Sequence, residues 1–165
     1  YMNKKEKLIS EEQVFIRMAS LCSQKEYCSF DISQKLYRMN LVTEEIDKIV
    51  NRLIKENYLN DERFVRSYIG DKLKINKWGR KKIELSLRQK QVNQSTINKI
   101  FNEYSEVELN KSLESVLIKK WKSIKGKTEN DKKGKLIRFA LGRGFGMKDI
   151  ISCMNSLNLS PIDDE

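Results

Sequence analysis

The chain has 165 residues, of which 39% are hydrophobic and 34% are charged, and this composition is typical of a folded, charge-rich protein rather than of a disordered one. It contains no histidine, which excludes Ser-His and Cys-His nucleophile pairs and imidazole metal sites. No apolar run approaches the roughly 20 residues that a membrane span needs, and the formal net charge of +10 favours a polyanionic partner.

The first third of the chain predicts a short tail and three helices. Residues 1–9 are polar and lysine-rich, so we expect a flexible N-terminal segment. The run Ser10 to Gln13 fits a capping box that opens a helix. Asp31 and Thr43 are typical helix starts for the second and third helices. We therefore predict a first three-helix repeat over 10–58.

The middle of the chain predicts a second repeat over 59–105. Its first helix ends in a polar hinge over 74–79, which contains Trp78. Two further helices are predicted over 80–90 and 93–104.

The last part predicts a third repeat over 106–158 and an acidic tail over 159–165. The basic stretch 125–133 carries no apolar residue and is predicted to be an exposed, mobile loop. Two helices are predicted over 131–141 and 147–157. The repeat is predicted to open with one long helix, whose apolar residues are Leu109, Leu113, Val116, Leu117 and Trp121.

An apolar motif with the spacing i, i+3, i+4, i+7 lies at the C-terminal end of each repeat and forms one stripe on a helix. It recurs after 51 and then 53 residues, and no segment alternates as a strand would. We therefore predict an all-α protein of three tandem three-helix repeats that form an elongated, curved array. The three copies are Ile46, Ile49, Val50, Leu53; Ile97, Ile100, Phe101, Tyr104; and Ile150, Cys153, Met154, Leu157.

Asn40, Gln91 and Gly144 occupy equivalent places just after the second helix of each repeat. A helix that ends there favours a residue in the left-handed conformation, for which glycine is best, asparagine tolerable and glutamine poor. The pattern predicts a left-handed backbone at all three positions.

The middle of the chain contains an ordered set of motifs. It comprises Tyr58 to Val65, Tyr68, Trp78-Gly79, Ile83, Leu87, Lys90 and Val92, with Arg143-Gly144-Phe145 as a second element near the C-terminus. This set resembles the RecX family of recombination regulators, in which an Asp-x-Arg-Phe-Ala element is followed by Tyr, Gly-Pro, Ile, Leu and Lys-Gly-Ile. This chain departs from the pattern at Val65, Arg80 and Gln91, where the family commonly has alanine, proline and glycine.

The resemblance implies a non-enzymatic cytoplasmic regulator that binds the RecA recombinase, mainly as a filament on DNA. Such a protein modulates, and usually inhibits, strand exchange and RecA's co-protease activity in recombination and DNA repair, and it binds DNA weakly. We expect no cofactor, no metal, no membrane association and a monomeric protein. Three cysteines, an odd number, agree with free thiols in a reducing cytosol.

Two basic clusters are the candidate binding sites for DNA and for the filament. Residues 66–90 and 119–138 each hold nine Lys or Arg and only two acids. A solvated helix face usually intersperses acids, so the imbalance favours binding. The first candidate set is Lys72, Lys74, Lys77, Trp78, Arg80, Lys81, Lys82, Arg88 and Lys90. The second is Lys119, Lys122, Lys125, Lys127, Lys132, Lys133, Lys135, Arg138 and Arg143, in a run that also contains Lys120.

Several single residues have two interpretations. Trp78 either stacks on a base or inserts into a protein groove, or it pins the hinge between two helices. Arg63 lies badly at a helix start and is expected to pair with Asp61 or with an acid of the adjacent repeat. Phe64 and Phe145 are expected in the core.

The main alternative is a general or sequence-specific DNA-binding protein built from helix-turn-helix-like units. It would need Arg, Asn or Gln on a recognition helix, whereas Glu44, Glu45 and Asp47 open the third helix of repeat one. A nuclease is disfavoured because no acid cluster has metal-ligand spacing. A scaffold that meets an acidic protein without DNA is the remaining alternative.

Overall fold

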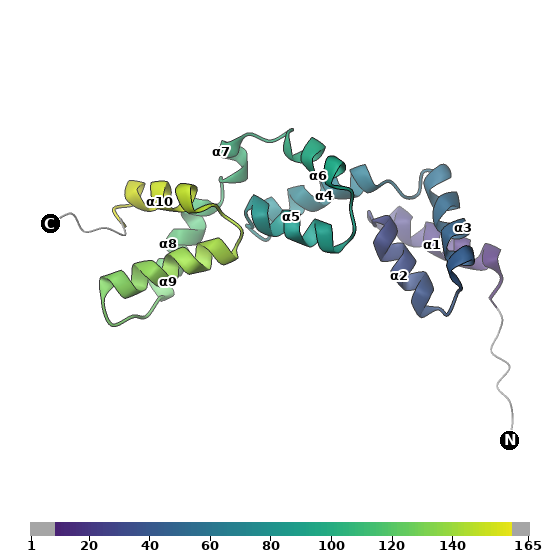
Figure 1. The fold of residues 1–165 in the computed structure, drawn as a ribbon, viewed down its shortest axis with the longest axis horizontal. Helices are drawn as coiled ribbons and strands as arrows, with labels where there is room; N and C mark the ends of the chain where they lie inside the picture. The colour runs from purple at the N-terminus through teal and green to yellow at the C-terminus, as the bar shows by residue number, and fades with distance from the viewer. Residues whose placement is uncertain (1–8, 160–165) are drawn as a thin grey trace, which may run out of the picture. The chain divides into compact units, whose positions relative to one another are not determined.

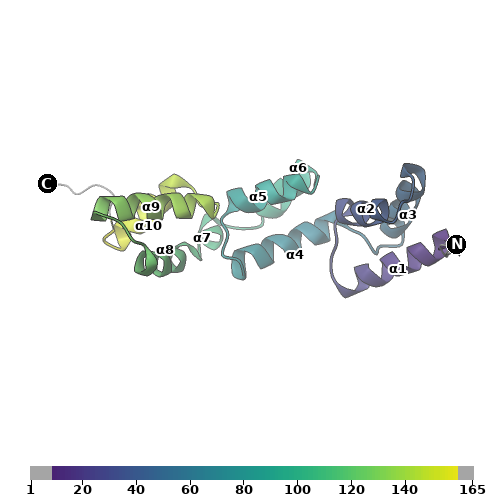
Figure 2. The ribbon, with the colours of Figure 1, turned by 90° about the horizontal axis from the view of Figure 1, so that it is seen from below.

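The computed structural model describes residues 9–159, in which every regular element is a helix, and this confirms the all-α prediction (Figures 1 and 2). Apart from Ile9 and Leu159, the predicted end segments 1–9 and 159–165 lie outside the described residues. The helices are α1 (Glu11–Gln24), α2 (Ser29–Arg38), α3 (Thr43–Lys55), α4 (Asp61–Lys74), α5 (Arg80–Gln89), α6 (Gln94–Phe101), α7 (Glu106–Leu109), α8 (Leu113–Ser123), α9 (Glu129–Gly142) and α10 (Met147–Ser156).

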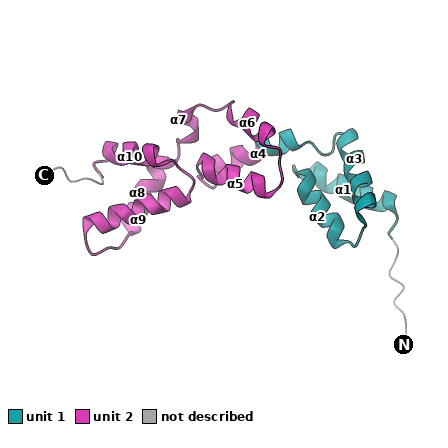
Figure 3. Cartoon of the chain, in the orientation of Figure 1, with its two compact units in different colours: residues 1–65 teal, residues 66–165 magenta. Residues whose placement is uncertain are grey.

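The chain divides into two compact units, residues 1–65 and 66–165 (Figure 3). The first unit holds α1, α2, α3 and the first turn of α4, and the second unit holds the rest.

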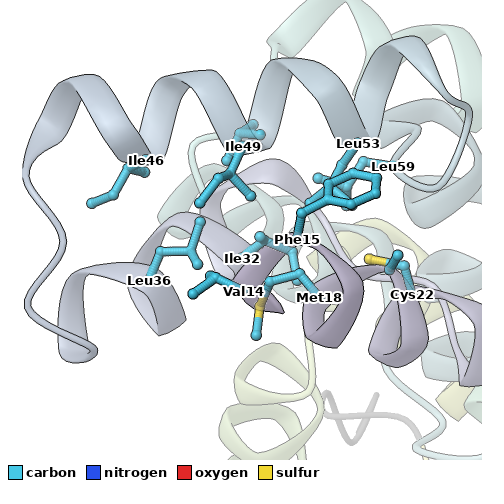
Figure 4. Packing of buried hydrophobic residues seen from close by; sticks show 12 residues of the cluster. Val14, Phe15, Met18, Cys22, Ile32, Leu36, Ile46, Ile49, Leu53 and Leu59 are labelled. Carbon is cyan, nitrogen blue, oxygen red and sulfur yellow. The ribbon is translucent and has the colours of Figure 1, made fainter. Parts of the chain in front are cut away.

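The core of the first unit lies where α3 packs against α1 and α2. The apolar stripe of α3 is buried as its spacing predicts, and Figure 4 shows Ile49 and Leu53 pointing from α3 toward the other two helices. The capping box at Ser10 is confirmed, because its hydroxyl accepts from the Gln13 amide at 3.2 Å.

The start of α2 differs from the prediction. The helix begins at Ser29 rather than at Asp31, since a distant side chain caps it. Asp61 Oδ1 accepts from the Ser29 amide at 2.9 Å and from the Ser29 hydroxyl at 3.0 Å. Asp31 instead lies in the first turn, where a carboxylate favours the positive end of the helix dipole. A cap supplied from 32 residues away leaves no local sequence signal.

The second unit contains two groups of packed helices. In one group, α8, α9 and α10 contact one another and bury Leu136, Phe145, Ile150 and Met154, as the stripe predicts (Figure 1). Cys153 and Trp121 are half-buried against that cluster. In the other group, α4, α5 and α6 bury apolar residues that include Ile69, Ile83, Leu87, Ile97 and Phe101.

The single long helix predicted at the start of the third repeat is wrong. The chain forms α7 and α8 with a turn over 110–112 between them. Ser105 closes a capping box with Glu108, and Ser112 Oγ donates to the Leu73 carbonyl at 3.2 Å. These two contacts stabilise a short helix and hold the turn against the end of α4. Leu109 and Leu113 are both buried, as the prediction required.

The predicted loop over 125–133 is also shorter than expected. Helix α9 begins at Glu129, because Thr128 accepts from the Asp131 amide at 3.1 Å and caps it. Only residues 124–128 are without helix.

The three helix ends predicted to be left-handed are confirmed. Asn40 has φ of 62°, Gln91 of 55° and Gly144 of 99°. After each of them the chain returns to an extended residue and starts the next helix. The same left-handed turn therefore forms with glycine, which suits it best, with asparagine, which tolerates it, and with glutamine, which suits it poorly.

Candidate nucleic-acid and filament interface

The two basic clusters meet at a joint between main chains in the second unit. The Gly79 amide donates to the Arg143 carbonyl at 2.8 Å, and the Lys81 amide donates to the Gly144 carbonyl at 3.1 Å. The start of α5 is thereby held against the turn that follows α9. We call this contact the glycine joint.

The glycine joint leaves no room for side chains. A Cβ added at Gly79 would lie 2.5 Å from the Gly144 carbonyl carbon, and one added at Gly144 would lie 2.5 Å from the Lys82 amide nitrogen. Gly144 also needs its positive φ. The two glycines, one from each motif of the sequence, thus bring residues 75–82 next to α8 and α9.

A pocket of about 300 Å³ lies beside the joint and is lined by cationic side chains from both clusters. Four cations line it, Lys77 from the α4–α5 connection and Lys119, Lys120 and Arg143 from the region of α8 and α9. No carboxylate is among the described residues that line it. One Arg143 guanidinium nitrogen donates to the Asn76 carbonyl at 3.1 Å, which fixes that side chain across the joint.

Aromatic rings anchor several of the cations. The ammonium groups of Lys72 and Lys82 lie 4.7 Å and 4.4 Å from the Trp78 ring centroid. Because Trp78 contacts α4 and α5 together, this geometry favours the hinge interpretation. The Lys120 ammonium and the Arg143 guanidinium lie 4.5 Å and 5.0 Å from the Phe139 ring centroid. The Lys132 ammonium lies 4.6 Å from the Trp121 ring centroid.

Other predicted site residues lie apart from the pocket. The Arg80 guanidinium carbon lies 4.7 Å from the Phe101 ring centroid, and Arg80 Nε lies 3.9 Å from Glu84 Oε2. Lys135 donates to the Lys125 carbonyl at 2.7 Å and closes the loop before α9. The remaining ones lie at the end of α4 (Lys74), in the first turn of α5 (Lys81) and at its end (Arg88, Lys90), on α8 (Lys122), in the 124–128 loop (Lys127) and on α9 (Arg138).

Lys133 differs from the prediction and is removed from the contact set. Its side chain is buried, with only 5% of its surface exposed. It lies three residues before Leu136 and seven before Ala140, so its aliphatic stem falls on the inner face of α9. Its place on the apolar stripe is the signal that sequence reasoning missed.

Arg63 is a structural clamp in the first unit. Its Nε donates to Glu26 Oε1 at 3.1 Å, so it pairs with an acid of the first repeat, which confirms one of the two predicted partners. Its Nη1 and Nη2 donate to the side chain and the carbonyl of Asn57 at 2.9 Å and 3.1 Å. Phe64 beside it is buried, as expected.

Most residues that line the pocket lie outside the candidate set, among them Ile75, Lys120 and Phe139. Lys120 was part of the basic run, and its spacing of one residue from Lys119 gave no reason to place both at one pocket. Phe139 lies three residues from Leu136 and is half-buried, and its contact with Lys120 of α8 leaves no local signal in the sequence.

Neither a metal centre nor a membrane span is found in residues 9–159. Their Cys, Asp and Glu side chains form no group able to hold a metal ion. None of the helices in this range combines the length and apolar character needed to cross a bilayer.

Two family models match the chain, one over each helical group that carries a basic cluster. Residues 60–99 match the second three-helix domain of RecX, and residues 106–154 match the third. Regulatory protein RecX of Clostridium tetani is 31% identical over 92% of this chain and 72% of its own length. The chain belongs to the RecX family.

Further comparisons agree with this RecX assignment. Regulatory protein RecX of Haemophilus influenzae (strain PittEE) is 29% identical over 79% of this chain and 86% of its own length. The crystal structure of RecX from Lactobacillus salivarius superposes with a TM-score of 0.76 over 90% of this chain and 97% of that one, at 19% identity, and shares the fold. RecX proteins are non-enzymatic regulators that modulate RecA, so RecA is the partner that the family implies.

Proposed function

We propose that this RecX-family protein binds the RecA filament together with its DNA and inhibits recombinase activity in the cytoplasm, as a monomer. The observation that carries the DNA contact is the joining of two basic clusters at one carboxylate-free pocket. Lysine and arginine meet phosphates there or along the exposed faces of α5 and α9. The division of the chain into three repeats belongs to this proposal, because stacked repeats offer an extended binding surface.

The charge contribution is tested by double reversals in a RecA ATPase or strand-exchange assay. Lys81→Glu/Lys82→Glu and Lys132→Glu/Lys135→Glu change the two clusters without touching buried Lys133. We expect both variants to lose most of the inhibition, since like charges repel the phosphates.

Lys111→Glu/Lys148→Glu is the matched control, because both lysines are exposed in the second unit and lie outside the clusters. It changes the net charge by the same amount. Full inhibition by both cluster variants, with native circular dichroism, would refute the proposed surface. Activation of RecA by the wild-type protein would refute the proposed direction.

A further inference from the structure

We infer that the pocket beside the glycine joint binds one nucleotide unit of a single strand, with its phosphate on the cations and its base against Ile75 and Phe139. This inference rests on the proposed function and names the ligand of that site. It singles out a small part of the basic surface, which can be separated experimentally from the rest.

The charge of the pocket selects an anion. Lys77, Lys119, Lys120 and Arg143 line it, and within residues 9–159 none of the four forms an ion pair. Elsewhere in the same unit cations are paired, as Arg66 is with Glu103 at 2.8 Å. A concave site with charges of one sign concentrates the field and attracts an oppositely charged group more strongly than a flat surface does.

The backbone at Lys77 adds a second observation. Its φ of 54° is left-handed, a conformation that lysine rarely adopts and that functional sites often retain. Glycine or asparagine fits such a position better. Lys77 lines the pocket directly before Trp78, whose amide donates to the Lys72 carbonyl at 3.0 Å.

The apolar part of the pocket favours a nucleotide over a bare anion. Ile75 lines it while 75% of its surface is exposed, and Phe139 contributes the ring that contacts Lys120 and Arg143. Cations flanked by an aromatic ring are the combination that single-strand binding sites use. A volume of about 300 Å³ is at the small end for ligand pockets, which suits one unit. A duplex keeps its bases stacked inside and cannot present one here.

The phosphate contact is tested by fluorescence anisotropy with a labelled oligo-dT of about 12 nucleotides, which exceeds a single site. Lys77→Gly/Lys119→Gln removes two exposed charges, and glycine suits the left-handed backbone. We expect about five- to tenfold weaker binding and a log–log salt dependence shallower by about 0.7 for each phosphate that is no longer neutralised. Lys111→Gln/Lys148→Gln, which removes the same charge outside the pocket, is expected to bind as the wild type does.

The base contact is tested with Ile75→Ala, whose exposed site makes misfolding no concern. We expect it to weaken binding of oligo-dT about threefold and to leave an abasic oligonucleotide of equal length unchanged. Competition with dTMP and with inorganic phosphate tests whether the pocket prefers a nucleotide within a strand to a free one. Displacement of oligo-dT by dTMP at low concentration would contradict a strand-bound unit.

Besides displacement by dTMP at low concentration, three results would overturn the inference. They are wild-type affinity of the Lys77→Gly/Lys119→Gln variant, equal loss of oligo-dT and abasic binding in Ile75→Ala, and pocket-dependent binding of a polyglutamate peptide as tight as oligo-dT. Each leaves the proposed function standing if RecA is still inhibited. Conversely, pocket-dependent oligo-dT binding with no effect on RecA would refute the proposed function and support the pocket.

Discussion

Two residues with a left-handed backbone, Gln91 and Gly144, tolerate side chains very differently. Both follow the second helix of a repeat, with φ of 55° and 99°. Gln91 is exposed, so only its backbone is disfavoured. Gly144 is buried in the glycine joint, where a Cβ would also collide with Lys82. The same turn therefore has a replaceable residue in one repeat and an irreplaceable one in the next.

Gln91→Gly is expected to be neutral or to stabilise the protein by about 0.5–1 kcal/mol, because glycine adopts positive φ without steric cost. Urea unfolding followed by circular dichroism measures the change. Clear destabilisation would contradict the left-handed assignment of this helix end.

Gly144→Ala is expected to destabilise the second unit by about 2 kcal/mol or more, through backbone strain and overpacking against Lys82. Gly142→Ala, two residues earlier in open space at the end of α9, is the control and should be neutral or stabilising. Similar urea midpoints for the two variants would argue against a tight joint.

At the scale of helices, ion pairs differ in how far they are buried. Arg63 and Glu26 are each about one third exposed, at 35% and 30%, and Arg63 also donates to Asn57. Arg66 and Glu103 are each 45% exposed. Both arginines belong to α4, and they provide a comparison between a structural clamp and a surface pair.

Arg63→Ala is expected to cost about 1–2 kcal/mol, since several charge-assisted hydrogen bonds disappear and Glu26 keeps a half-buried carboxylate. The measured free energy of unfolding should fall by clearly more than in Arg66→Ala, because water screens the exposed pair. Equal losses would mean that Arg63 does not act as a clamp.

The Arg66–Glu103 pair also predicts a dependence on pH. The hydrogen bond from Arg66 lowers the pKa of Glu103 below its usual value of 4.5, so the stabilisation is complete above that value and is lost as pH falls through the lowered pKa. Glu103→Gln should therefore be less stable than the wild type at pH 7 and equally stable at strongly acidic pH. Urea titrations across this pH range measure the difference in the free energy of unfolding between the two proteins. A difference that does not change with pH would contradict the ion pair.

The helices themselves were largely predictable, because their apolar spacing is local. The stripes of α3, α6 and α10 and the left-handed turns followed from the sequence pattern. The start of α2 and the break between α7 and α8 did not, since Asp61 and Leu73 act there from 32 and 39 residues away. Caps and turns supplied by distant residues leave the periodicity unchanged.

At the scale of the whole molecule, the distribution of charge pointed to two basic clusters but not to their meeting place. The glycine joint is a contact between main chains, and hydrogen bonds such as that from the Gly79 amide to the Arg143 carbonyl follow no side-chain pattern. Lys77 and Lys119 come together because of it. For Lys133 the charge pattern predicted a contact that the structure does not offer, because a lysine in a basic run can lie on the inner face of its helix.

DNA binding by the full chain is expected to weaken steeply with salt. Each phosphate contact releases counterions and contributes a log–log slope of about −0.9 on duplex DNA and about −0.7 on a single strand. Affinities measured over a salt series, for unrelated sequences of equal length, should give several such contacts and little sequence preference. A salt-insensitive affinity would argue against phosphate contacts, and a large preference for one sequence would favour a base-reading protein.

The glycine joint has a consequence for any mutational survey of this protein. Its donors and acceptors are amide and carbonyl groups, which every residue type but proline carries, so truncating side chains one at a time passes over it. A survey of that kind would rank Lys77 or Arg143 and never register the contact that brings both of them to one pocket. The joint is reached by adding a Cβ at Gly79 or Gly144, or directly by an amide-to-ester exchange at Lys81.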